Sequence, residues 1–436
     1  MSEHLPTWRR AAPWLGLATA SALVAAAIAV PLLSGWDVHT RVADDRSAAP
    51  WHGFWEVKVG VGTPIALLLA AGGVVWGPSL AQRLSVRALL LVSFAASLGW
   101  LLALALVDGE SGLTRALGNP HEYLPTARRV DDVGALLHGY VERIPLDAPG
   151  NWPIHVAGHP PGMLLFFVGL VTLGLGGDLA AALVVTTLAA TIPAAVIVTL
   201  RALDAEWAAR RITPWLVLTP AAVTLAVSAD AVMAAVAAWG SACLALAARR
   251  SLWWSVPSGL LFGLLVMMSY GLPLFGLVAL GVLVAARTWR PLVPVAATAA
   301  AVVGAFAVGG FAWWEAFDVL HDRYWDGIAS ERPGAYWTWA NVALLVATAG
   351  PVVGAGLACV RELPRRVAPL VVGTVVALAV ADLSQMSRSE VERIWLPFVP
   401  WLTLAVLALP ARWERRGLAI QVVVALVVQH ALYTSW

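Results

Sequence analysis

The chain has 436 residues, of which 60% are hydrophobic and 12% are charged, and its mean hydropathy is +0.78. This composition excludes an ordinary soluble protein, because soluble domains carry about twice that share of charge. The net charge of +2 points to neither nucleic acid nor an acidic partner, because the arginines fall in short clusters between apolar runs. Cys243 and Cys359 lie in or beside apolar runs, so we expect no disulfide framework and no cysteine metal site.

The apolar runs are about as long as a spanning helix and lack the alternation of barrel strands, so we predict an all-α, polytopic transmembrane protein with almost no strand. Trp8-Arg9-Arg10 leads into a first helix that we expect to be retained and to start in the cytoplasm. The later runs continue to the C-terminus, so residues 1–436 form one transmembrane domain without a separate soluble domain. The runs lie at residues 13–34, 59–77, 88–107, 213–228, 230–247, 253–270, 271–286, 291–312, 337–359, 367–384, 395–410 and 418–434.

Arginines in the links between runs predict the cytoplasmic side, because positive charge stays inside. By this rule the larger loops 108–161 and 314–336 lie outside the cell membrane. Residues 162–200 are long enough for two crossings, but the arginines that follow are inside only if there is one. We therefore expect the helix that starts at residues 159–162 to be short, and about 13 crossings in all.

Charged and aromatic residues are densest in residues 119–162. An amphipathic helix lying in the membrane interface over 124–144 would explain part of this pattern. Its apolar and charged faces would hold Leu136, Leu137 and Tyr140, and Arg128, Arg129, Asp132 and Glu142. The ends of the patch, Glu122-Tyr123 and His155 to Gly162, are harder to explain as a solvated surface. Paired prolines fix the backbone where a loop enters a helix, and the free N–H groups there favour an anion.

An acidic residue followed by tyrosine, and then His-Pro-Pro at a helix start tens of residues later, resembles the GT-C superfamily. Its members are multi-helix membrane enzymes that transfer sugars from polyprenyl-phosphate donors on the outer side of the membrane. The resemblance covers the overall topology and two or three short motifs. It implies a carboxylate base in an outside loop, a groove for the donor lipid and basic groups that hold its phosphate.

Several carboxylates are candidates for that base. In many GT-C members the acidic residue follows the first helix, where this chain has Asp37, Asp44 and Asp45, but the chain also offers Glu122 in the next loop. We rank Glu122 slightly above Asp44, with Asp131 and Asp132 behind them. The base would take the acceptor proton as attack develops.

Substrate-binding candidates come from three segments. Two arginines of the run RSEVERIWLPFVPW suit a phosphate, because a guanidinium presents a planar fork of donors, although a surface ion pair is an alternative. Glu390 or Glu392 would orient them. The loop 314–336 suits sugar binding, and a solvated interfacial helix explains its residues equally well. The binding candidates are Tyr123, His155, His159, Pro160, Pro161, His321, Arg323, Tyr324, Arg388, Glu390 and Arg393.

The sequence thus favours a membrane glycosyltransferase with a polyprenyl-phosphate sugar donor and an envelope glycan, lipid or protein acceptor. A divalent cation is a possible cofactor, but no spacing is specific for one. A multi-pass transporter or lipid flippase, or a non-catalytic envelope-assembly subunit, is the alternative. Lys58 is the only lysine and alanine is abundant, a composition that favours a GC-rich bacterial genome of actinobacterial type.

Overall fold

The computed structural model describes residues 7–40 and 47–434, with side chains from residue 11 onward. Asp44 and Asp45, two predicted candidates for the base, lie outside the described residues. Within the described part, the only strands are β1 (Gly53–Trp55) and β2 (Leu432–Thr434), which pair antiparallel. The prediction of an all-helical chain with almost no strand is therefore confirmed.

Five helical stretches among the described residues are long and apolar enough to cross a membrane, which takes about 20 residues. They are α1 (Thr7–Ser34) from Ala11 onward, α2 (Gly62–Arg83), α3 (Val86–Ala105) with η1 (Leu106–Asp108), α9 (Asp178–Ala190) with α10 (Ile192–Ala202), and α13 (Ala229–Arg249). The apolar window of α13 is 78% buried, against 17% for α1. Helix α13 therefore lies at the centre of the bundle and α1 at its periphery.

Further apolar helices are bent or shorter. The pair α16 (Leu292–Val308) and α17 (Trp313–Asp326) passes the same test only if its 76° bend is counted within one span. The shorter apolar stretches are α8 (Gly162–Thr172), η3 (Leu252–Trp254) with α14 (Ser255–Met268), η4 (Leu272–Phe275) with α15 (Gly276–Ala286), α20 (Ala368–Leu383), and η6 (Leu396–Phe398) with α22 (Val399–Thr403) and η7 (Leu404–Ala408). How many crossings these add stays a prediction.

The expectation of a short helix after the proline pair is confirmed. Helix α8 has 11 residues, so it is roughly 17 Å long, against about 30 Å of hydrocarbon in a bilayer. It begins at Gly162, where a Cβ atom would lie 2.4 Å from the backbone oxygen of Met267 in α14. Only glycine permits this approach of α8 to α14, which anchors the start of α8 in the bundle.

Four predicted helices are broken. Residues 337–359 divide between α18 (Gly334–Ala349) and α19 (Val352–Leu357), because Gly350 has φ +89° and Pro351 follows it. Residues 213–228 divide between α11 (Glu206–Val217) and α12 (Ala222–Leu225), and 395–410 divide among η6, α22 and η7. Prolines lie within each of these segments and interrupt the helical hydrogen bonds. Residues 124–144 form α5 (Tyr123–Ala127), α6 (Val133–His138) and η2 (Val141–Arg143), because Asp132 accepts a hydrogen bond from the backbone N–H of Ala135 and starts a new helix.

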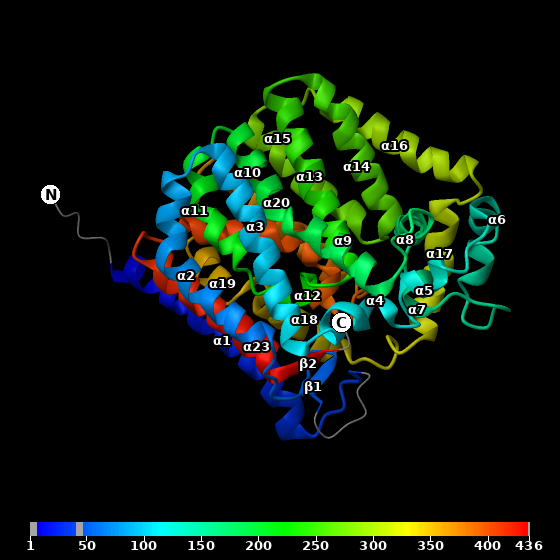
Figure 1. Cartoon of the computed structure of the whole chain (residues 1–436), viewed down its shortest axis with the longest axis horizontal. Coiled ribbons are helices and arrows are strands. Elements are labelled where there is room, and N and C mark those ends of the chain that lie inside the picture. Colours follow the sequence, from blue (N-terminus) through cyan, green and yellow to red (C-terminus); the bar gives the residue numbers. More distant parts are fainter. Residues whose placement is uncertain (1–6, 41–46, 435–436) are drawn as a thin grey trace.

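The remaining helices complete the bundle and its loops. They are α4 (Ser111–Gly118), α7 (Ile154–Ala157), α18 (Gly334–Ala349), α19 (Val352–Leu357), η5 (Val360–Glu362), α21 (Val391–Ile394) and α23 (Trp413–Ala431). Helices α5, α6, α7 and α17 gather at one end of the molecule, at the right of Figure 1.

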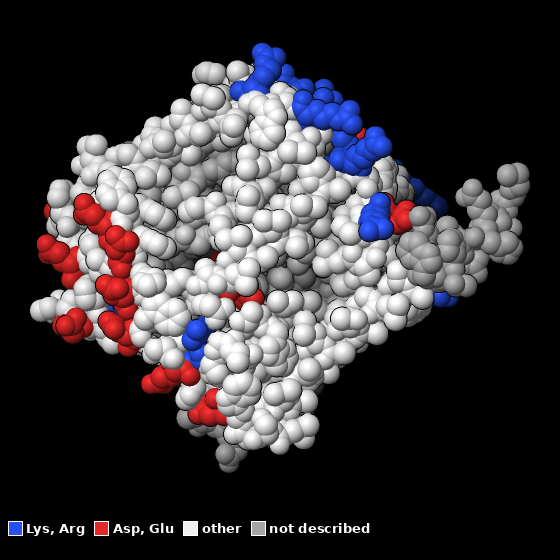
Figure 2. Space-filling model, turned by 180° about the vertical axis from the view of Figure 1, so that it is seen from behind, with Lys and Arg blue, Asp and Glu red and all other residues white. Residues whose placement is uncertain are grey.

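Charge separates along the molecule. In Figure 2, which views the molecule from behind, acidic side chains gather at the left, where the end with α6 and α17 now lies. Lysine and arginine side chains gather along the upper right, and the face between the two groups is largely uncharged. An uncharged band between charged ends is what a bundle that spans a bilayer needs.

Candidate functional site

A cavity of about 180 Å³ lies between residues 154–158, the C-terminal part of α17 and the link 386–390 that follows α20. Its ionisable lining residues are His155, Arg323, Tyr324, Arg332, Arg388 and Glu390. Three guanidiniums face one carboxylate, so the lining carries an excess of positive charge. Such a cavity favours an anionic ligand.

Hydrogen bonds hold the Arg388 side chain at the cavity. Its Nε donates to Gln385 Oε1 (3.1 Å), and its Nη1 donates to the backbone oxygens of Arg332 (2.7 Å) and Ala329 (3.2 Å). The backbone N–H of Arg388 donates to the hydroxyl of Tyr324 (2.9 Å). The guanidinium is therefore fixed in one orientation, which lowers the entropy that a ligand contact would cost.

Arg332, only 4% exposed, joins the link 386–390 to the N-terminal part of the chain. Its Nε donates to the backbone oxygen of His39 (3.1 Å), its Nη1 donates to the backbone oxygen of Arg388, and its Nη2 donates to Glu390 Oε1 (3.3 Å). Burial alone would raise the pKa of Glu390, but the charges of Arg332 and then Arg393 outweigh it and hold that pKa well below its usual value. Glu390 is therefore ionised at the cavity wall.

A buried charge network lies beside the cavity and reaches it through His155. Glu122, 5% exposed, accepts hydrogen bonds at Oε1 from His155 Nδ1 (2.6 Å) and Arg393 Nη1 (3.0 Å). The Nε of Arg393 lies 3.5 Å from Asp230 Oδ2 in the first turn of α13. Burial raises the pKa of Glu122, but His155 and Arg393 together lower it to about 2. The Glu122 carboxylate is thus ionised and orients the His155 ring.

His159 and Tyr123 pack behind this network. The His159 Nδ1 bonds the backbone oxygen of His155 (2.8 Å), and burial lowers the pKa of His159. The Tyr123 ring stacks on Phe167 of α8 at 5.9 Å and meets His159 edge-on at 5.8 Å. Pro161 precedes the first residue of α8. These residues fix the backbone on which His155 stands.

The structure sorts the predicted binding residues and bases into three groups. His155, Arg323, Tyr324, Arg388 and Glu390 line the cavity. Buried or half-buried residues outside its lining are Glu122, Tyr123, His159, Pro160, Pro161 and Arg393. Exposed residues outside its lining are Asp131, Asp132 and His321, of which the two carboxylates line a separate surface hollow of about 600 Å³.

The sequence assigns no individual role to two residues of this region. Ser389 lines the cavity, and Asn341 in α18 binds the link 386–390. Arg332 also lines the cavity, and the sequence places it only within the loop that suits sugar binding. A lone asparagine in the apolar run 337–359 is a signal in itself, because polar side chains inside a membrane are costly. Nothing in the sequence distinguishes Ser389 from a solvated loop serine.

No metal centre emerges from the described residues, since no group of three or more His, Cys, Asp or Glu side chains among them could hold an ion. The free cysteines Cys243 and Cys359 lie in α13 and beside α19, and neither lines the cavity. A divalent cation as cofactor stays a prediction.

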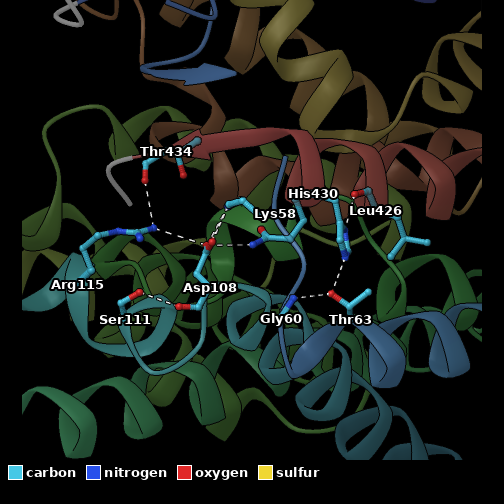
Figure 3. Close-up of polar contacts among 10 residues, drawn as sticks. Lys58, Gly60, Thr63, Asp108, Ser111, Arg115, Leu426, His430 and Thr434 are labelled. Carbon is cyan, nitrogen blue, oxygen red and sulfur yellow. Dashed lines mark hydrogen bonds and ion pairs between the residues drawn. The ribbon is translucent and has the colours of Figure 1, made fainter. Parts of the chain in front are cut away.

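A second, half-buried cluster of charge surrounds Asp108, where η1 meets the C-terminal strand (Figure 3). Lys58 Nζ lies 2.8 Å from Asp108 Oδ1, and Gln429 donates to Asp108 Oδ2 (3.2 Å). Arg115 lies 3.7 Å from Asp108 Oδ2 and donates to the backbone oxygen of Thr434 (3.2 Å). The cluster ties the segment before α2, the end of α3 and the C-terminal strand together.

Comparison of the chain with known proteins finds no relative. No family model matches the chain, and neither a curated protein nor a solved structure matches it. Its function is therefore argued from the chemistry of the cavity and its surroundings.

Proposed function

We propose that the chain is a polytopic membrane glycosyltransferase of the GT-C type, with about 13 crossings. It transfers a sugar from a polyprenyl-phosphate donor to an envelope glycan, lipid or protein acceptor. One observation carries the proposal: the cavity joins three arginines to a histidine that a buried carboxylate orients. This transfer requires cations that stabilise the departing phosphate and a group that accepts the proton of the attacking hydroxyl.

The charge asymmetry supports an orientation in the bacterial cell membrane. Arginine-rich links such as 361–366 and 412–416 follow the positive-inside rule if they are cytoplasmic. The acidic end of Figure 2, where α6 and α17 lie, is then extracytoplasmic and carries the cavity, while the N-terminus is cytoplasmic. A lipid-linked donor would reach the cavity from the outer leaflet.

Arg323, Arg332 and Arg388 are the candidates for the donor phosphate, because they line the cavity. Their positive charge would stabilise the phosphate as it departs. The sequence predicts that Arg393 binds the donor phosphate. In the structure it pairs with Glu122 and Asp230 and lies outside the cavity lining. It would hold Glu122 in place.

In the proposed transfer step, His155 is the base that accepts the proton of the acceptor hydroxyl. The acceptor oxygen attacks the anomeric carbon, the bond from that carbon to the phosphate oxygen breaks, and polyprenyl phosphate leaves with the electron pair. His155 takes the acceptor proton, and Glu122 stabilises the charged ring as a positioning residue. A carboxylate with a pKa of about 2 is itself a weak base. Asp44, outside the described residues, is the alternative base.

The test is transfer of labelled sugar from a panel of polyprenyl-phosphate sugars by the full chain purified in lipid. We expect His155→Ala to abolish transfer and Glu122→Gln to lower it by about a hundredfold. Glu142→Gln, an exposed carboxylate of the same loop, is the matched control and should transfer normally. If Asp44→Asn abolishes transfer while His155→Ala keeps it, the base is Asp44.

A transporter or flippase is the second candidate. The buried pair of Arg393 and Asp230 favours it, because Asp230 opens a helix long enough to cross the membrane. A wild-type chain that turns over no donor, yet moves a lipid-linked sugar across vesicles, would establish transport and exclude the transferase. A wild type inactive in both assays would instead favour a non-catalytic assembly subunit.

A further inference from the structure

Ser389 has a buried hydroxyl beside the charged groups of the cavity. The residue lines the cavity and is 1% exposed. Its Oγ has no hydrogen-bond partner among the described residues. Leaving a buried hydroxyl unpaired costs free energy, so such a group in a folded protein needs an explanation.

The backbone at Ser389 is strained. Ser389 has φ +74° and the next residue, Glu390, has φ +63°. Non-glycine residues rarely adopt this left-handed region, and two in succession persist only where the surroundings enforce it. Strain of this kind gathers at functional sites, because it fixes a side chain where a relaxed backbone would not.

Asn341 supplies that enforcement from α18. This side chain is 1% exposed and uses both ends of its amide. Its Oδ1 accepts a hydrogen bond from the backbone N–H of Ser389 (3.2 Å), and its Nδ2 donates to the backbone oxygen of Ser387 (2.7 Å) and to Asp382 Oδ1 (2.9 Å). The backbone is thus held on both sides of Arg388, and Ser389 cannot rotate away from the cavity wall without breaking these bonds.

The neighbouring arginines, Arg332 and Arg388, donate most of their hydrogen bonds to the protein, so a ligand oxygen would need a further hydrogen-bond donor. Each nitrogen of the Arg332 guanidinium already donates to a protein oxygen, and Arg388 donates to three. These arginines supply charge, but much of their directional hydrogen bonding is committed to the protein. A serine hydroxyl can rotate to donate to whichever ligand oxygen is nearest.

We propose that Ser389 is a ligand-contacting residue, whose hydroxyl donates a hydrogen bond to a phosphate oxygen of the lipid-linked donor. Asn341 is the positioning residue that holds Ser389 for this contact. The inference rests on the proposed function, because it takes the cavity to be the donor phosphate site.

The experiment measures binding of farnesyl phosphate to the full chain in lipid nanodiscs by calorimetry. We expect Ser389→Ala to weaken binding by about tenfold, the usual worth of a hydrogen bond to a charged group. The unfolding temperature of Ser389→Ala should be equal to or above that of the wild type, because an unpaired buried hydroxyl is removed. Ser384→Ala is the matched control, since Ser384 bonds only backbone groups of its own segment and lies outside the lining.

The outcomes separate the two proposals. If the wild type binds and Ser389→Ala binds equally well, Ser389 is not a ligand contact and the inference fails, while the proposed function stands. If the wild type binds no farnesyl phosphate, the phosphate site fails, and the inference fails with it. The transfer assay then decides separately whether the chain uses another class of donor.

A double-mutant cycle tests Asn341. If Asn341 acts through Ser389, then Asn341→Leu should weaken binding by about tenfold, and adding Ser389→Ala should weaken it no further. A purely structural Asn341 would lower the unfolding temperature and add its effect on binding to that of Ser389→Ala. Thr348→Val, which removes a buried hydroxyl from the same helix, controls for damage to α18.

Discussion

Two clusters of charge, one half-buried around Asp108 and one beside the cavity, differ in what surrounds them. Around Asp108, both carboxylate oxygens bond to protein nitrogens from Lys58 and Gln429, and the ion pair closes a junction between chain segments. Around the cavity, charged side chains border about 180 Å³ of space, a strained backbone and the unpaired hydroxyl of Ser389. Both clusters carry charge, and each holds a buried polar atom without a partner among the described residues, Arg115 Nε in the first and the Ser389 hydroxyl in the second. Only the second borders a cavity of about 180 Å³ and a strained backbone.

This difference teaches that a buried ion pair alone does not indicate a functional site. A buried pair is retained when removal of one partner would leave the other uncompensated. A site needs in addition a volume for the ligand and groups whose bonding capacity the protein leaves unused. Changes at Asp108 should therefore act on stability, and changes at the cavity should act on ligand binding as well.

The largest effect is expected at the Asp108 cluster. Asp108→Ala leaves Lys58 and Arg115 close together without a counter-charge, so the free energy of unfolding should fall by about 3–5 kcal/mol. Denaturant unfolding of the purified chain measures it. Ser111→Ala removes only a hydrogen bond to the Asp108 backbone and should change stability by about 0.5 kcal/mol or less. Equal effects of the two substitutions would show that the ion pair does not hold the junction.

Acid sharpens the comparison at Glu122. Its pKa in the folded chain is about 2, below its ordinary value of 4.5. The ionised form is therefore favoured by folding, and this stability is complete above pH 4.5 and is lost as pH falls toward 2. The loss amounts to about 3 kcal/mol. The free energy of unfolding, measured between about pH 5 and about pH 2, should fall less steeply for Glu122→Gln than for the wild type. If it falls with the same slope in both, Glu122 is not held ionised by His155 and Arg393.

The sequence was sufficient for the helices because their signal is local. Long apolar runs predict the five helices that are long and apolar enough to span a membrane, and the proline pair before Gly162 predicts the short α8. Most of the other predicted crossings are shorter, bent or broken in the structure. Where Pro220 or Pro397 breaks a run, hydropathy alone overestimates the helix, because proline removes a backbone donor that apolar composition does not reveal.

The site was only partly predictable because its contacts are not local. Glu122 and Arg393 are separated by 271 positions, and no periodicity links them. Residue type and loop position sufficed to single out both, together with His155 and Arg388. They could not show that Arg393 pairs with carboxylates, nor that Asn341 and Ser389 join the cavity wall, since those facts follow from tertiary packing.

A middle-sized effect is expected at Arg388. Arg388→Lys keeps the charge but loses the forked hydrogen bonds to Gln385 and the two carbonyls, so unfolding should become easier by about 1–2 kcal/mol. Trypsin still recognises lysine, and cleavage after position 388 should therefore become faster than in the wild type. Arg361→Lys, exposed at η5, should leave its own cleavage rate unchanged. Unchanged cleavage at 388 would mean that charge, and not the fork, holds the link.

The smallest effect is expected at Asp132, which is exposed and belongs to neither cluster. Its side chain accepts a hydrogen bond from the backbone N–H of Ala135 (3.0 Å) at the start of α6. Asp132→Ala should destabilise this helix by about 1 kcal/mol, seen as roughly fivefold faster hydrogen exchange at that amide, whereas Asp132→Asn should keep the cap. If Asp132→Asn also speeds exchange, the carboxylate charge contributes beyond the capping hydrogen bond. An exposed acid outside both clusters would then stabilise the chain through its charge, against the expectation that charge matters here mainly where it is buried and paired.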